Sequence, residues 1–269
     1  MIQLTTDVSD SLLELLREDG DLIDAAEVGP WFSVEQVRRY RQALPELPFH
    51  FHGADLIERV GLIPGTVSKI AAYLHYTRSP WASMHITMWL PGMVGLMLRR
   101  GWRMPLPHPE QATQRFIQRV RRLVHSIHVP VILENTEPPP FKGYDFEVQP
   151  QRITQVLEET GCGFLLDIGH ARISAARLGM EVDEYLGSLP LKRVVQVHVS
   201  GPRLRAGCLV DAHEPLQEVD YAVLDFVLER TKPQAVTLEY IREREPLREQ
   251  LFRLRGMLDT HHASLGRRS

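Results

Sequence analysis

Short apolar runs rich in β-branched residues alternate along this chain with longer segments whose apolar residues recur at three- and four-residue spacing. Eight of the short runs are predicted as strands: Ile2–Leu4, Leu22–Glu27, Pro48–His52, Met84–Thr87, Val129–Asn135, Gly163–Asp167, Arg193–Ser200 and Ala235–Tyr240. The helical spacing is clearest over Val34–Ala43, Pro109–Val124, Gln151–Thr160, Asp220–Arg230 and Leu247–Leu258. Strands that alternate with helices predict a parallel sheet with helices packed outside it.

Eight strand–helix units are the number needed for a closed (β/α)8 barrel, the TIM barrel of the α/β class. The length of 269 residues is also usual for that fold. An open doubly wound sheet would normally carry a glycine-rich phosphate-binding turn after its first strand, and none is present. Because no linker, low-complexity tract or change of composition interrupts the chain, we predict a single barrel domain over residues 1–269.

Composition narrows the classes of function. Lys and Arg number 31 against 34 Asp and Glu, so the net charge of -3 lacks the basic excess typical of nucleic-acid-binding proteins. The longest apolar stretch, Met84–Met97, contains Pro91 and is too short to span a bilayer. Two cysteines and an acidic N-terminus without a signal pattern favour a reducing, cytoplasmic location. We therefore expect neither a nucleic-acid nor a membrane partner.

Ionisable side chains gather where the predicted strands end. In a (β/α)8 barrel the carboxyl ends of all strands meet at one mouth, which holds the active site. Seven fragments place polar residues there: PFHFHG, SMHIT, VILENTE, FLLDIGH, VVQVHVSG, CLVDAHEP and VTLEY. They contribute the candidate metal ligands His52, His85, Glu134, Asp167, His170, His198, Asp211, His213 and Glu239. Five imidazoles and four carboxylates are therefore expected in one volume.

Metal ions account for this collection better than any single-residue role does. Carboxylates brought close together repel one another and lose hydration as the mouth narrows. Neutral imidazole and carboxylate are good ligands for iron, manganese and zinc. Because nine candidates exceed the three or four protein ligands of one ion, two or three ions that share a bridging carboxylate are predicted. Each residue alone could instead cap a helix or bond to the backbone, so the prediction depends on the coincidence of all nine.

Within this set, Glu134 lies near the middle of the ring of strands and is the candidate bridging ligand. Glu134, His170 and Asp211 form the predicted catalytic group. Three neighbours are assigned supporting positions: His50, Asn135 and Glu27. His50 shares the inward face of its strand with His52 but lies one layer deeper, and Glu27 is either an orienting group or a helix cap.

The ordered fragments resemble the multinuclear non-heme iron oxidative enzymes, a barrel family of the xylose-isomerase-like superfamily. The resemblance runs from about His50 to the last helix. It is carried by Met104–Glu110 (MPLPHPE), Ile132–Asn135 (ILEN), Thr160–Asp167 (TGCGFLLD), Ile173–Ala175 (ISA), Val197–Gly201 (VHVSG), Val210–His213 (VDAH) and Thr237–Tyr240 (TLEY). Single fragments of this kind are weak, whereas the ordered set is specific.

The resemblance implies an oxidoreductase with two or three Fe ions in mixed Fe(II)/Fe(III) states that uses O2; zinc or manganese would also suit the ligands. It implies a substrate among ribosomally made precursor peptides, whose side chains are modified, often at cysteine. A small partner protein that delivers the peptide is implied as well. Matched by position, metal-binding or adjacent motif residues of the family fall on His52, His85, Glu134, Asp167, His198, Asp211, His213 and Glu239.

This chain departs from the family pattern at two places. Many members have a pair of asparagines after the aspartate, where this chain has Gly169 and His170. The resulting Asp167–x–x–His170 spacing is similar to that of the sugar isomerases and the metal-dependent endonucleases of the superfamily. The second histidine of the family after the seventh strand is replaced by Pro202. One imidazole is therefore lost and another gained, which puts the number and identity of the metals in question.

Other functions stay open on the sequence alone. A divalent-metal sugar isomerase or epimerase fits the spacing of Asp167 and His170, and a non-catalytic metal-binding or peptide-maturation partner fits the ligand set. A DNA-repair endonuclease is disfavoured by the acidic balance. The segment Met88–Met93 is predicted either to cover the mouth or to pack in the core. Cys208 is expected to be buried, and Pro202–Leu209 to be a loop.

Overall fold

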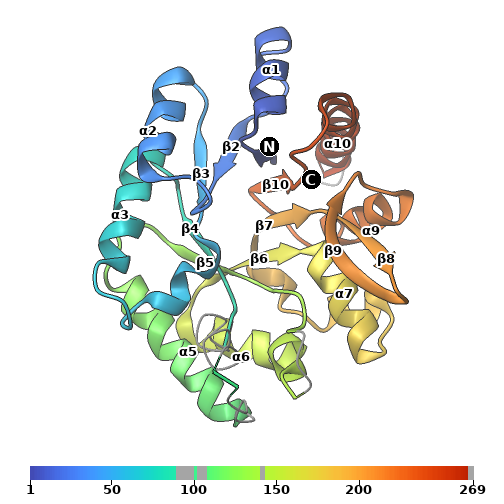
Figure 1. Cartoon of the computed structure of the whole chain (residues 1–269). Helices are drawn as coiled ribbons and strands as arrows, with labels where there is room; N and C mark the ends of the chain where they lie inside the picture. The colour runs from blue at the N-terminus through green and yellow to red at the C-terminus, as the bar shows by residue number, and fades with distance from the viewer. Residues whose placement is uncertain (89–99, 102–107, 140–142, 266–269) are drawn as a thin grey trace.

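In the computed structural model, residues 1–88, 100–101, 108–139 and 143–265 are described. Eight parallel strands close into a ring in the order β1-β10-β7-β6-β5-β4-β3-β2 (Figure 1). Their bounds are β1 Gln3–Asp7, β2 Ala25–Val28, β3 Phe49–His52, β4 Ala82–His85, β5 Val131–Glu134, β6 Gly163–Asp167, β7 Val194–Val199 and β10 Ala235–Leu238. The predicted (β/α)8 barrel is confirmed.

Helices surround this ring of strands (Figure 1). Their bounds are α1 Asp10–Glu18, α2 Val34–Ala43, α3 Thr66–Thr77, α5 Pro109–Val124, α6 Pro150–Thr160, α7 Ile168–Leu178, α8 Val182–Gly187, α9 Glu218–Leu228 and α10 Arg244–Leu265, with short 3-10 turns η1 Ala54–Arg59, η2 Asp145–Val148 and η3 Leu191–Arg193. All five helices predicted from periodicity are present. No helix in the described ranges is both long enough and apolar enough to cross a membrane.

Local sequence fixes where the helices begin. Ser33 precedes α2, where its Oγ accepts from Gln36 N at 3.2 Å and Gln36 Oε1 accepts from Ser33 N at 2.8 Å. This reciprocal capping box satisfies two backbone donors of the first turn. Asp167 is the N-cap of α7: its Oδ1 accepts from the backbone N–H of His170 at 2.6 Å. The end of β6 and the start of α7 are thereby fixed at the mouth.

Side chains that point into the barrel form layers. Trp81, Ile132, Leu165 and Ala235 make a buried apolar cluster toward the amino ends of the strands. Toward the carboxyl ends, seven strands contribute one ionisable side chain each, and Glu239 follows directly after β10. We name this set the ionisable ring: Asp7, Glu27, His52, His85, Glu134, Asp167, His198 and Glu239. Three neighbouring pairs stand directly opposite each other in the strand register: Asp7 with Glu27, His85 with Glu134, and Asp167 with His198. Other neighbours in the ring are offset by two residues: His52 pairs with Ser83 rather than His85, and Glu134 with Leu165 rather than Asp167.

Three sequence-based assignments were wrong. The first strand was predicted to end at Leu4 but continues to Asp7, because Thr5 and Thr6 are polar yet bond inside the barrel: Thr5 Oγ1 lies 2.5 Å from Thr237 Oγ1, and Thr6 Oγ1 donates to Leu238 O at 2.7 Å. The predicted loop after β7 is an antiparallel hairpin of β8 (Gly201–Arg205) and β9 (Cys208–Glu214), and Cys208 is exposed rather than buried.

A buried carboxylate on η1 predicts a pH-dependent stability. Burial and the negative charge of Asp55 raise the pKa of Glu58 to about 7, and Arg119 opposes the shift. Because this pKa exceeds the ordinary 4.5, the folded chain binds the proton more tightly than the unfolded chain. That stabilisation is complete below about pH 4.5 and is lost as the pH rises through 7. We expect E58Q to raise the free energy of unfolding by roughly 1 kcal/mol at pH 8 and to leave it unchanged at pH 4.5.

Thermal unfolding of E58Q and wild type at the two pH values measures this effect. E14Q, at an exposed position of α1, is the control and should follow wild type at both. Equal melting temperatures of E58Q and wild type at pH 8 would contradict the prediction.

Candidate metal centre

Glu134 lies at the centre of the mouth and faces four imidazoles from four different elements. Its Oε2 is 3.5 Å from His52 Nε2 and 3.6 Å from His85 Nε2. Its Oε1 is 3.4 Å from His170 Nδ1 and 3.9 Å from His198 Nδ1. The side chain is only 1% exposed, and its Oε2 has no hydrogen-bond partner within the described part of the chain. A buried carboxylate with a free oxygen between imidazoles is well placed to bridge two cations.

The first possible metal position is formed by His52, His85 and Glu134, whose ligand atoms lie within 4.8 Å of one another. The two imidazoles present Nε2 to each other at 3.2 Å. Their outer nitrogens are occupied: His52 Nδ1 lies 2.9 Å from Ser83 Oγ, and His85 Nδ1 lies 2.8 Å from Asp55 Oδ1. Both rings are thus held with Nε2 directed at the shared carboxylate, as ligands to one ion require.

A second position is formed by Glu134, Asp167 and His198, again with ligand atoms within 4.8 Å of one another. Asp167 Oδ2 and His198 Nδ1 are buried and lack a hydrogen-bond partner among the described residues. Glu239 Oε1 lies 3.1 Å from the same His198 Nδ1. Glu27, His198 and Glu239 form a further group of this kind. Orphaned polar atoms at this density fit a bound cation, because a buried donor or acceptor without a partner is costly.

Asp211 and His213 reach the site from β9 rather than from the end of a barrel strand, which corrects the assignment of the VDAH fragment. His213 Nε2 lies 2.7 Å from Asp211 Oδ2, and His170 Nε2 lies 3.8 Å from the same oxygen. His213 has a left-handed backbone with φ of 45°. That conformation is unfavourable for a residue with a side chain and is typical of functional positions. The side chain is 41% exposed, so this pair forms the open side of the centre.

The supporting residues occupy three different kinds of position. Asn135 connects β5 to β6: its Oδ1 accepts from Asp167 N at 3.0 Å and its Nδ2 donates to Asp167 O at 2.9 Å. His50 packs its ring 4.6 Å from the Trp81 ring, beneath the mouth and away from Glu134. Glu27 is fully buried, with Oε1 3.2 Å from His198 Nε2, so it contacts a candidate ligand directly.

Two carboxylates beside the candidate ligands were missed by the sequence analysis. Asp7 belongs to the ionisable ring, and its Oδ1 is buried without a hydrogen-bond partner in the described ranges. The misplaced end of β1 concealed it, although the alternation Thr5, Asp7 on one strand face could have shown it. Asp55 lies on η1 and contacts His85; no motif pointed to it. Of the predicted wall Met88–Met93, residues 89–93 lie outside the described residues, while Met88 is buried and accepts from Thr113 Oγ1.

Without an ion, carboxylates and imidazoles compete for protons. Burial raises the pKa of Glu134, but His85 and His52 lower it to about 2. Burial raises the pKa of Asp167 to about 8, with Glu239 and Glu134 adding to the shift against His170. Burial lowers the pKa of His213, yet Asp211 raises it to about 10. Divalent ions can replace these shared protons, so binding should release protons and strengthen as the pH rises.

One family model matches residues 25–255 and is described as the RiPP precursor modification enzyme MbnB/TglH/ChrH. The chain belongs to this family. The match includes most of the barrel and every residue of the ionisable ring except Asp7. It also confirms the family resemblance stated from the sequence.

Individual relatives of this RiPP-modification family member are distant. A UPF0276 protein of Caulobacter vibrioides is 28% identical over 152 residues, which cover 56% of this chain and 54% of that protein. UPF0276 protein PA3283 of Pseudomonas aeruginosa is 27% identical over 217 residues, which cover 76% of this chain and 72% of that protein. The chain spans about half the length of the Caulobacter relatives that it matches.

Solved structures share the barrel of this family member at low identity. A D-tagatose 3-epimerase-like protein superposes with a TM-score of 0.60 at 16% identity, over 98% of this chain and 100% of that one. The 3-keto-D-glucoside 4-epimerase YcjR from E. coli in its apo form gives 0.61 at 13% identity, over 95% and 100%. These likenesses agree with the (β/α)8 barrel fold.

The two departures from the family pattern lie side by side. A Cβ atom added at Gly169 would lie 3.4 Å from Pro202 Cγ, 3.2 Å from Asp167 Oδ1 and only 2.3 Å from Ser200 Oγ. No side chain fits at Gly169 while Ser200 keeps its place. We therefore expect G169A to displace Ser200 and Asp167, to cost about 1–3 kcal/mol of stability and to weaken metal binding roughly tenfold.

Metal titration and thermal unfolding test this prediction. G256A on α10, where a Cβ meets nothing within 4 Å, is the matched control and should bind metal as wild type does. The double variant G169A/S200A removes the hydroxyl that collides and should recover part of both losses. Unaltered metal affinity in G169A would show that Asp167 does not depend on this packing.

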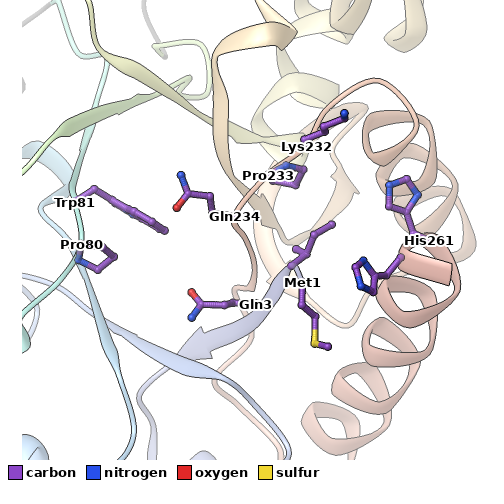
Figure 2. A pocket seen from close by; sticks show the side chains of 10 residues that line it. Met1, Gln3, Pro80, Trp81, Lys232, Pro233, Gln234 and His261 are labelled. Carbon is purple, nitrogen blue, oxygen red and sulfur yellow. The ribbon is translucent and has the colours of Figure 1, made fainter. Parts of the chain in front are cut away.

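A cavity at the opposite end of the barrel is separate from this centre. It has a volume of about 500 Å³ and is lined by Gln3, Trp81, Lys232 and Gln234 near the amino ends of three strands, together with His261 and His262 of α10 (Figure 2). No member of the ionisable ring lines it. The two histidines of the last helix therefore do not join the candidate metal centre.

Proposed function

We propose that this chain is a metal-dependent enzyme that uses two or three iron ions and O2 to oxidise a side chain of a ribosomally made precursor peptide. The observation that carries the proposal is Glu134, whose two oxygens face two groups of candidate ligands. Membership of a family of RiPP precursor modification enzymes supports the peptide substrate. The residues fit metal ions because several buried ligand atoms lack other partners among the described residues.

Two sets of side chains would bind the metal ions, and a third set would line the open side of the centre. His52, His85 and Glu134 would hold one ion; Glu134, Asp167, His198 and Glu239 would hold a second. When bound, iron would supply the redox chemistry with O2 that no amino-acid side chain can supply. Burial of the ring would exclude water from the reacting groups. His170, Asp211 and His213 lie toward the open side, where the Asp211–His213 pair could hold or transfer a proton or complete a third metal position.

Anaerobic reconstitution with Fe(II) tests this proposal. Metal analysis should give at least two ions per chain, Mössbauer spectra should show coupled iron, and O2 should be consumed in the presence of a precursor peptide encoded by a neighbouring gene. A small protein encoded nearby is the proposed peptide-delivering partner and should increase turnover. Fewer than two ions per chain, or unchanged peptide in air, would overturn the proposal.

A sugar isomerase or epimerase is the second candidate. It is favoured by the Asp167–His170 spacing, and the superposed structures include proteins described as sugar epimerases. Such a reaction needs one or two divalent ions and no O2. Turnover of a ketose that continues under argon would favour this function. Tight metal binding with neither activity would favour a non-catalytic metal-binding or peptide-maturation protein.

A further inference from the structure

We propose that Glu27 is a positioning residue that fixes the tautomer of His198, through a buried relay of hydrogen bonds that starts at Trp81. The inference rests on the proposed function only in taking His198 as a metal ligand. Glu27 and His198 are both fully buried, on β2 and β7 across the barrel. The contact between them therefore crosses the interior beneath the metal centre.

The two nitrogens of the His198 imidazole have different surroundings. Nδ1 faces the centre, 3.1 Å from Glu239 Oε1 and 3.9 Å from Glu134 Oε1. Nε2 faces the opposite way, 3.2 Å from Glu27 Oε1 and 3.0 Å from Gln196 Nε2. Only Nδ1 can reach an ion held by Glu134. A neutral imidazole binds metal through the nitrogen without a proton, so Nε2 must carry it.

The orientation of the Gln196 amide decides where that proton goes. The indole N–H of Trp81 can only donate, and it lies 2.8 Å from Gln196 Oε1. The amide NH2 must therefore point the other way, where it donates to Glu27 Oε2 at 2.8 Å and to Thr237 Oγ1 at 2.8 Å. Both amide hydrogens are used by these two acceptors. Gln196 Nε2 and His198 Nε2 also lie at hydrogen-bond distance, 3.0 Å apart, but the two oxygen acceptors are nearer and take both amide hydrogens.

The hydroxyl groups of Thr237 and Thr5 are consistent with this orientation of the Gln196 amide. Thr237 Oγ1, having accepted from Gln196, is free to donate to Thr5 Oγ1 at 2.5 Å, and Thr5 Oγ1 donates to Val236 O at 3.3 Å. Every donor in the relay then has one acceptor. With Glu27 Oε2 bound to Gln196, Oε1 is left for the Nε2 proton of His198. Glu27 thus directs the Nδ1 lone pair into the metal centre, as carboxylates behind metal-binding imidazoles generally do.

Zinc titration of the chelator-stripped full chain provides the first test. E27A should lose ten- to a hundredfold in affinity for one zinc equivalent, the size of effect found when such a partner is removed. The equivalent bound by His52, His85 and Glu134 should keep its affinity. E27Q retains one carbonyl acceptor but turns an NH2 toward the other donor of the relay, so it should recover only part of the loss. W81F, which lets the Gln196 amide turn over, should show a smaller loss, and E58Q, a buried carboxylate outside the relay, should show none.

NMR gives a readout that a merely structural role of Glu27 would not change. Long-range 1H–15N correlation spectra of the zinc-loaded chain, assigned with H198Q, should show the proton of His198 on Nε2 in wild type and on both nitrogens in part in E27A. Unchanged zinc affinity in E27A, or a proton on Nδ1 in wild type, would overturn the inference. If peptide oxidation is absent but E27A still weakens zinc binding, the proposed function fails and this inference stands.

Discussion

Replacing Glu134 with glutamine is expected to abolish the metal centre as a multinuclear site. One carboxylate contacts four imidazoles, so the neutral amide would remove a ligand from both metal positions at once. We expect E134Q to retain at most one weakly bound ion per chain. Peptide oxidation should fall at least a hundredfold, because an interaction with both ions is lost. Metal analysis after Fe(II) reconstitution, together with turnover in air, measures both effects.

Two further variants, E58Q and H52A, distinguish loss of metal from unfolding of the chain. E58Q changes a buried carboxylate on η1 to the same amide and should keep wild-type metal content. H52A should lose an ion from the first position but keep the second, since His52 contacts only one oxygen of Glu134. Metal content equal to wild type in E134Q would rule out a bridging role for this residue.

Removal of metal by a chelator is expected to destabilise the fold strongly. The ionisable ring has five carboxylates in one layer, and without cations these groups repel one another or must take up protons. An ion that binds only the folded chain adds about 2.7 kcal/mol when its free concentration is a hundred times its Kd. For a chain of this size we expect the melting temperature to fall by roughly 5–10 °C for each ion removed.

Thermal unfolding with and without EDTA, followed by addition of Fe(II) or Zn(II), measures this shift. E134Q should show a much smaller dependence on the chelator than wild type, because it has little metal to lose. If wild type melts at the same temperature with and without EDTA, the ring is stabilised by shared protons alone.

The fold could be predicted from the sequence because parallel strands buried on both faces are continuous apolar runs. Val131–Glu134 and Gly163–Asp167 are of this kind, and their predicted positions agree with the structure to within a few residues. β1 was misjudged because the hydroxyls of Thr5 and Thr6 are satisfied by the neighbouring strand β10, through residues more than two hundred positions away in the sequence. Periodicity within one segment carries no information on such a partner.

The convergence of the candidate ligands could be predicted for a related reason. In a barrel of known direction, the end of every strand lies at the same mouth, so His52, Glu134 and Asp167 had to meet there. Asp211 and His213 were expected at the mouth, but their position on a β-hairpin was not. The sequence after β7 carries no pattern that predicts two strands. The relay from Trp81 to Glu27 needs side-chain orientations that only three-dimensional contacts give.

The hairpin of β8 and β9 separates this centre into two parts with different freedom to change. The ionisable ring is built at the ends of the barrel strands, where most of its side chains are buried among one another. Asp211 and His213 belong to an appendage inserted between β7 and α9, beside α7 in Figure 1. Evolution could therefore exchange the groups at the open side, and with them the reaction, while the barrel below continued to hold its ions. The adjacent Gly169 and Pro202 lie at the border between these two parts.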